Sequence, residues 1–191
     1  MAKKDLIVVL PNEHLRERSR SIGVLTPEIH QVIEDMKSAT LDWEASRPHE
    51  VGVALAAIQI NQPYRLIIVR ENFEDKANQN FIVLINPKVV KLDGEVKEDF
   101  EGCLSITDVY GTVPRHDKVR VRAMDENGHE IRIKAEGFLA RVLQHEIDHL
   151  NGIMFIDHIE GDKSAFYKIS SEGKLEPLPY EAVQKAGIFR K

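Results

Sequence analysis

The segment from Gly137 to Asn151 constrains the fold of this chain more than any other part of its sequence. Its apolar side chains are spread around most of a helical circumference: Phe138, Leu139, Ala140, Val142, Leu143, Ile147 and Leu150. A helix that is apolar on nearly every side is expected to lie buried inside a protein. Gly152 is placed to end this helix in a left-handed conformation. The rest of the chain must therefore pack around it.

The same helix carries the sequence His145-Glu146-Ile147-Asp148-His149. Residues four apart share one helical face, so both imidazoles can bind one divalent ion. Glu146 beside them has the position of the general base in many metallohydrolases. Burying these groups without partners would cost on the order of several kcal/mol. Two solvent-exposed histidines would need no metal, but a helix this apolar favours a metal site.

Cys103 is the best candidate for a third ligand, because catalytic metal sites usually have three protein ligands and one open position. It lies in the stretch Glu101-Gly102-Cys103-Leu104-Ser105, where Gly102 would let the backbone approach a metal closely. As the single cysteine of the chain, it excludes an internal disulfide. A lone cysteine is more often an inert core residue, and spacing alone does not show that Cys103 meets the histidines.

Strand-like and helix-like segments follow one another without regular alternation, which predicts an α+β fold. Strand-like runs occupy residues 65–69, 81–85, 119–124, 131–135 and 153–156, with a hairpin turn at residues 126–128. A helix is expected from Thr26, with its end at Arg47 and Pro48. We therefore expect antiparallel β-sheets packed around the buried helix that carries the His-Glu-x-x-His motif.

The length of 191 residues fits a single catalytic domain spanning residues 1–191, with a C-terminal tail from about residue 160. Within this tail, residues 170–179 are typical of an exposed loop and residues 180–188 of a short helix. We assign no function to the tail.

The formal net charge of -5, from 31 acidic and 26 basic residues, disfavours indiscriminate binding to nucleic acid or anionic membranes. The apolar run from Leu6 to Leu10 stops at Pro11 and is too short for a signal peptide core or a membrane span. We therefore expect a cytoplasmic monomer with no specific DNA binding and no membrane association.

Three motifs in this order make the chain similar to the peptide deformylase family: Gly52-Val53-Ala54-Leu55-Ala56-Ala57-Ile58-Gln59, Glu101 to Ser105, and Gln144 to Gly152. With Pro11, Leu15-Arg16 and Val113-Pro114-Arg115, the resemblance covers about residues 5 to 160. The chain departs from the family pattern at Ala54, where the family usually has glycine, and at Ile58, where Pro or Thr is frequent. An alanine at position 54 should be tolerated at negative φ and cost about 1 kcal/mol at positive φ.

The resemblance implies a hydrolase of protein biosynthesis that removes the formyl group from the N-terminal formylmethionine of nascent proteins at the ribosome and releases formate. It implies one divalent metal ion per chain, held by Cys103, His145 and His149. Ferrous iron would be the native metal, with zinc, nickel or cobalt as substitutes, although this ligand set alone does not choose among them.

The resemblance also implies roles for three further groups in this N-terminal processing reaction. Glu146 would take a proton from the attacking water and return it to the leaving amine. The Gln59 side-chain amide and the Leu104 backbone N–H would stabilise the negative oxygen that develops on the former formyl carbonyl. Without the motif, Gln59 would more often be a structural cap or turn residue.

By the same resemblance, candidates to line a pocket for the methionine side chain are Val53, Leu104, Arg141 and Val142, with Arg141 contributing its stem. The peptide would lie along Val53 and Ala54 as an added strand. Arg115 would lie near the following residues, or could equally be a solvated surface charge.

The remaining candidate residues have less defined roles. Glu101 and Asp148 could orient a ligand imidazole or pair with an arginine. The other six histidines show no metal-binding spacing and are expected to be structural or exposed: His14, His30, His49, His116, His129 and His158.

Two other functions remain open. One is a metallopeptidase that uses the same helical motif, with a third histidine or an acid in place of Cys103. The other is a noncatalytic protein whose metal only staples the fold, such as a binding module at the ribosome. This second alternative leaves Gln59 and Glu146 unexplained.

Overall fold

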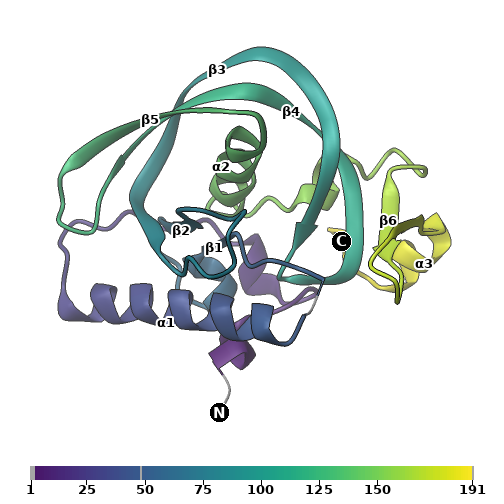
Figure 1. The fold of residues 1–191 in the computed structure, drawn as a ribbon, viewed down its shortest axis with the longest axis horizontal. Helices are drawn as coiled ribbons and strands as arrows, with labels where there is room; N and C mark the ends of the chain where they lie inside the picture. Colours follow the sequence, from purple (N-terminus) through teal and green to yellow (C-terminus); the bar gives the residue numbers. More distant parts are fainter. Residues whose placement is uncertain (1–2, 48, 191) are drawn as a thin grey trace.

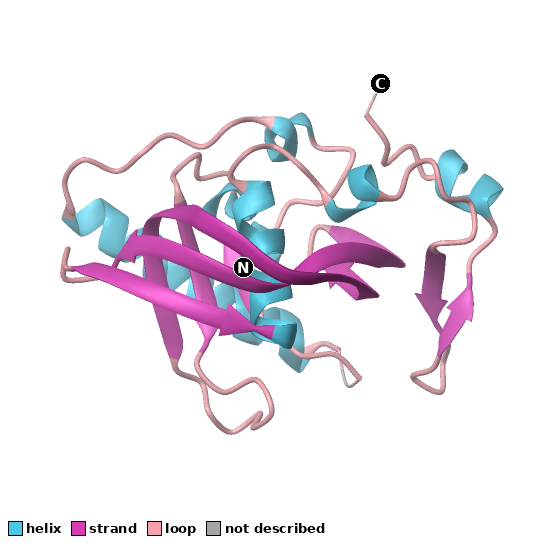
Figure 2. Cartoon of the chain, turned by 90° about the horizontal axis from the view of Figure 1, so that it is seen from above, coloured by secondary structure: helices cyan, strands magenta, loops and turns pink. Residues whose placement is uncertain are grey.

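The computed structural model describes residues 3–47 and 49–190 as one bent antiparallel sheet with helices on both sides (Figures 1 and 2). Its seven strands run in the order β1-β2-β3-β4-β6-β7, and β5 pairs with β4. The strands are β1 Ala54–Ala56, β2 Leu66–Arg70, β3 Phe81–Cys103, β4 Ile106–Met124, β5 Glu130–Glu136, β6 Phe166–Ile169 and β7 Leu175–Pro177. The helices are α1 Pro27–Ala45, α2 Gly137–His149 and α3 Tyr180–Lys185. The prediction of an α+β fold with antiparallel strands is confirmed, although the strands form one sheet rather than several.

Strand β2 lies between the two long helices, as Figure 1 shows. Because side chains alternate along a strand, Ile67 and Val69 join the core cluster that contains α2. Leu66 and Ile68 join the cluster that contains α1. Burial on both faces explains why this strand is a continuous apolar run.

Helix α2 lies in the concave side of the sheet, beneath the arc of β3, β4 and β5 in Figure 1. Gly137 begins it directly after β5 with a φ of 59°, and Gly152 follows its end with a φ of 74°. A side chain at position 152 would collide with the backbone carbonyl of Arg16. The predicted buried helix and its left-handed glycine stop are therefore confirmed, with the last helical residue at His149.

The hairpin of β3 and β4 is much longer than the sequence indicates. The predicted runs at residues 81–85 and 119–124 are its two outer ends, and the turn lies between Cys103 and Ile106. The predicted hairpin turn between β4 and β5 is confirmed, with Gly128 at a φ of 85°. Cys103 is consequently the last residue of β3, beside the turn of the longest hairpin.

Other predictions need correction. The run at residues 153–156 is not a strand: it leads into a 3-10 turn, Phe155–His158, whose first two side chains are buried. The tail predicted as a loop at residues 170–179 contains strand β7, which pairs with β6. The predicted terminal helix is present as α3. Helix α1 ends at Ala45, before Arg47, and Pro48 lies outside the described residues.

Within residues 3–47 and 49–190, no helix is both long enough and apolar enough to cross a membrane.

Candidate active site

Cys103, His145 and His149 converge on one point, and their ligand atoms all lie within 4.8 Å of one another. The His149 Nε2 atom is 3.3 Å from the Cys103 sulfur and 3.1 Å from the His145 Nε2 atom. Metal–ligand distances of ~2.0 Å to nitrogen and ~2.3 Å to sulfur in a tetrahedral site place such atoms about 3.3–3.6 Å apart. The three side chains therefore fit one divalent ion, and the structure brings together the ligands that the sequence suggested.

The two histidines respond differently to this environment. Burial disfavours a charged His145, but its contacts with Cys103 and Glu101 raise its pKa well above the ordinary value. Burial and the neighbouring His145 lower the pKa of His149 well below the ordinary value. The cluster thus favours a positive charge on His145 and a neutral His149 ring, and the neutral imidazole is the form that binds a metal.

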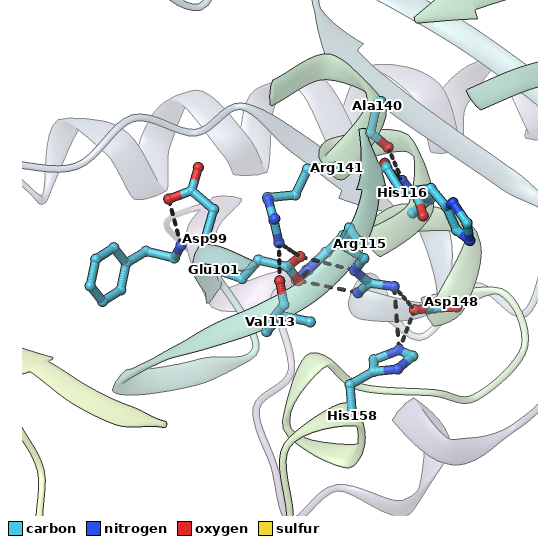
Figure 3. A network of polar contacts seen from close by, with 12 residues as sticks. Asp99, Glu101, Val113, Arg115, His116, Ala140, Arg141, Asp148 and His158 are labelled. Atoms are coloured by element: carbon cyan, nitrogen blue, oxygen red, sulfur yellow. Dashed lines mark hydrogen bonds and ion pairs between the residues drawn. The ribbon is translucent and has the colours of Figure 1, made fainter. Parts of the chain in front are cut away.

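Glu101 connects the metal site to a buried ion-pair network (Figure 3). Its carboxylate lies 2.8 Å from His145 Nδ1, so the Nε2 atom of that ring faces the other two ligands. The Arg115 guanidinium donates two hydrogen bonds to Glu101, at 3.0 and 3.1 Å, and Arg141 donates one at 2.8 Å. Burial alone would raise the pKa of Glu101, but His145 and Arg115 hold it well below its usual range. Glu101 therefore both orients a ligand imidazole and pairs with arginines.

Glu146 projects into the same site without being one of the three converging ligands. Its Oε2 atom is buried and has no hydrogen-bond partner among the described residues. Burial is the largest effect on Glu146 and raises its pKa to about 7. The charge of His145 lowers this pKa, and the charge of Glu101 raises it by a smaller amount. A carboxylate with this pKa can accept and release a proton near neutral pH, as general acid–base chemistry requires.

Gln59 approaches the site from the 3-10 turn Ala57–Ile60, which follows β1. Its Oε1 atom accepts a hydrogen bond from the Ala56 N–H at 2.8 Å, so it does cap a turn. Its Nε2 atom lies 3.5 Å from the Cys103 sulfur and 3.1 Å from Ser105 Oγ. The cap fixes the direction of the amide, whose N–H groups then point toward Cys103 and Ser105.

A hollow of about 290 Å³ opens beside the metal ligands. Its lining includes Gln59, Glu146 and all but one of the candidate substrate residues: Val53, Ala54, Leu104, Arg141 and Val142. The guanidinium of Arg141 is held by Glu101 and by the carbonyls of Val113 and Lys97. Its charge is thus engaged away from the hollow, as expected for a residue that contributes its stem.

Ala54 has negative φ, because the only described residues other than glycine with positive φ are Asn61, Asn86 and Asp108. It lies in extended conformation in β1. The alanine that replaces the usual glycine is therefore accommodated without backbone strain.

Arg115 does not line this hollow. It lies on the other side of Glu101, 6% exposed, and borders a second hollow together with Asp148 and His158. The Asp148 carboxylate accepts a hydrogen bond from Arg115 at 2.5 Å and contacts His158 at 2.8 Å (Figure 3). The alternative of a solvated Arg115 is wrong, because its side chain is buried between two carboxylates. Its expected place near the peptide stays a prediction.

Several residues of the hollow's rim were not anticipated from the sequence: Trp43, His49, Glu50, Phe100, Tyr110, Phe138 and Ile169. The Tyr110 hydroxyl donates to Glu50, and burial together with this carboxylate raises the Tyr110 pKa. An added methyl at Gly102 would lie 2.5 Å from the Tyr110 ring. The glycine before Cys103 was a usable signal for close packing, whereas the other rim residues come from scattered segments without a shared pattern.

Comparison with known proteins gives a consistent family. Residues 4–165 match the family model described as polypeptide deformylase. A peptide deformylase of Rhodopseudomonas palustris (strain BisB5) is 40% identical over 162 residues, which cover 83% of this chain and 87% of that protein. One of Methylocella silvestris is 37% identical and covers 95% of both chains.

Solved structures agree. The peptide deformylase of Synechococcus elongatus, in complex with actinonin, is similar with a TM-score of 0.74 and 36% identity, over 82% of this chain and 80% of that one. The peptide deformylase of Legionella pneumophila gives a TM-score of 0.70 and 38% identity, over 80% and 83%.

Proposed function

Because this chain belongs to the peptide deformylase family, we propose that it hydrolyses the formyl amide of N-terminal formylmethionine in nascent peptides. The family makes it an enzyme of N-terminal deformylation. The observation that carries the finer proposal is the meeting of Cys103, His145 and His149 beside Glu146, in a hollow that a peptide can enter.

A divalent metal held by these three ligands would activate a water molecule and polarise the formyl carbonyl. Glu146 accepts the proton of the attacking water, for which its buried carboxylate with a pKa of about 7 is suited. It then returns the proton to the leaving amine, so that formate and a free amino terminus are the products.

Gln59 and Leu104 would stabilise the negative oxygen of the intermediate. The Gln59 Nε2 group already points toward Cys103, and its amide adds no charge. Among residues 3–47 and 49–190, the Leu104 N–H finds no backbone acceptor, which leaves it free to donate to the substrate. Such fixed donors act where charge develops in the transition state.

The peptide would add to strand β1. This strand is at the edge of the sheet and pairs only with β2 among the described strands. Its first residue Ala54 and the preceding Val53 border the hollow, so its unpaired edge can accept an extended peptide. Leu104, Val142 and the Arg141 stem would then surround the methionine side chain.

We also propose that residues 1–191 act as one catalytic domain, in monomeric form, on nascent chains at the ribosome in the cytoplasm. The continuous sheet that joins β1 through β7 supports the single domain. Light scattering after size exclusion would test the monomer, because a second copy would double the mass of 21.8 kDa.

The activity can be tested by formate release from formyl-methionyl peptides after anaerobic purification with ferrous iron. We expect one equivalent of formate per peptide, and ferrous iron to support at least as high a rate as zinc, nickel or cobalt at equal occupancy. A fully metal-loaded protein that releases no formate would favour the noncatalytic alternative. Cleavage of internal peptide bonds instead would favour the metallopeptidase.

Cys103→Ala is expected to weaken metal binding by about a hundredfold or more, since loss of even a supporting residue costs 10- to 100-fold. Metal titration followed by elemental analysis would measure it. His129→Ala is the control, because that ring is exposed and its one ion-pair partner among the described residues is Asp125. Full metal retention in Cys103→Ala would instead point to a peptidase-type ligand set.

A further inference from the structure

The hairpin of β6 and β7 lies at one end of the molecule (Figures 1 and 2), and its residue Ile169 lines the active-site hollow. It follows the part of the chain that matches the family model, which ends at residue 165. Strand β6 extends the sheet by pairing with β4, where Tyr110 is opposite Tyr167. Because Tyr110 borders the hollow, this pairing brings the hairpin to the rim.

Three contacts connect the hairpin with the rim. Ile169 of β6 lines the hollow directly. Tyr167 packs edge-on against Phe100, with ring centroids 4.9 Å apart. At the hairpin turn, an added methyl at Gly173 would lie 3.3 Å from the His49 ring, so this turn rests on a second rim residue. Tyr167 and Ile169 are two residues apart on one strand and therefore face the same way.

The side chains on this part of the rim are mostly apolar. Phe100 and Phe138 border the hollow and are 41% and 45% exposed, although both are large hydrophobic side chains. The nearby Glu50 carboxylate is already engaged by Tyr110 and by Arg47, the latter at 3.1 Å. An apolar side chain placed here would cover exposed aromatic surface without stripping water from a free charge.

We propose that Ile169 and Phe100 form a binding site for an apolar side chain at one of the first two positions after the formylmethionine, because successive side chains of an extended peptide point to opposite sides. This inference rests on the proposed deformylase function and adds peptide selectivity to it. The C-terminal hairpin then acts as a wall of the substrate site. A peptide that follows the β1 edge would pass from the metal ligands toward this rim.

The test compares two formylated tripeptides, formyl-Met-Leu-Leu and formyl-Met-Ser-Ser, by measuring kcat and KM for formate release. The unaltered protein is expected to prefer the leucine peptide through a lower KM. Ile169→Ser should raise the KM for the leucine peptide about fivefold, with kcat changed less than twofold, because one apolar contact is removed from binding. The selectivity between the two peptides should fall by the same factor.

Leu175→Ser is the matched control, since Leu175 pairs with Ile169 across the hairpin but does not line the hollow. It should leave the selectivity of the unaltered protein in place. Equal selectivity in Ile169→Ser and the unaltered protein, or an equal loss in Leu175→Ser, would overturn the proposed subsite. Absence of formate from both peptides with the unaltered protein would instead defeat the deformylase function on which the subsite depends.

Discussion

Glu146→Ala is expected to retain its metal and to lower kcat for formate release by about a thousandfold, within the range for loss of a general base. Glu146 is not among the three converging ligand atoms, so coordination should survive the change. Its Oε2 atom is buried without a partner in the described structure, so the fold does not depend on a hydrogen bond there. The loss should therefore appear in kcat and not in metal content.

Elemental analysis and steady-state kinetics on the same sample would separate these effects. Glu136→Ala is a suitable control, because Glu136 precedes the same helix and is exposed, with a long contact to Lys118. It should keep full turnover. If Glu146→Ala worked as fast as this control, the role of Glu146 as the base would have to be abandoned.

Glu101→Ala is expected to lower the free energy of unfolding of the metal-free protein by about 3–5 kcal/mol, the usual cost of breaking a buried ion pair. Glu101 is 5% exposed and accepts hydrogen bonds from two buried guanidinium groups. In this variant Arg115 would keep its hydrogen bond to Asp148, and Arg141 would keep its hydrogen bonds to two backbone carbonyls. Both guanidinium groups would lose the carboxylate that they share. Metal affinity should also fall, by about 10- to 100-fold, since His145 loses the group that orients it.

Urea unfolding with and without metal would measure both quantities. Glu98→Ala is the matched control, because Glu98 lies on the same strand and is exposed. Its unfolding free energy should stay within about 0.5 kcal/mol of the unaltered protein. A Glu101→Ala protein as stable as this control would mean that the arginines find other compensation.

The parts of the fold that were predictable are those whose burial leaves a pattern. Helix α2 is apolar around its circumference and could be placed almost to the residue, with Gly152 as its stop. Strand β2 is buried on both faces and shows as an apolar run. In both cases the pattern of apolar residues in the sequence matches the sides of the element that are buried in the fold.

The long β3–β4 hairpin was not predictable in this way. From residue 90 to residue 100 strand β3 is almost entirely exposed, so no side of it has to be apolar. Four register shifts along its pairing with β4 also interrupt the two-residue alternation. The β6 and β7 strands are only four and three residues long, below the length at which alternation can be recognised.

The same contrast applies to the site. His145 and His149 are visible because helical geometry converts their spacing into proximity. Glu101 and Arg141 are 40 residues apart, and only the fold brings them together. The sequence suggested that Glu101 either orients an imidazole or pairs with an arginine, and could not show that it does both.

The three proposed metal ligands come from the end of a β-hairpin and from a helix, and Cys103 and His149 are separated by 46 positions along the chain. A denatured chain cannot hold all three donors together at low cost, so the ion would bind almost entirely to the native form. Its binding free energy then counts toward the folding equilibrium, which shifts with the logarithm of free metal concentration. With the proposed metal bound, the melting temperature of this enzyme would depend partly on the metal supply of its surroundings, and chelation would act on it as a mild denaturant.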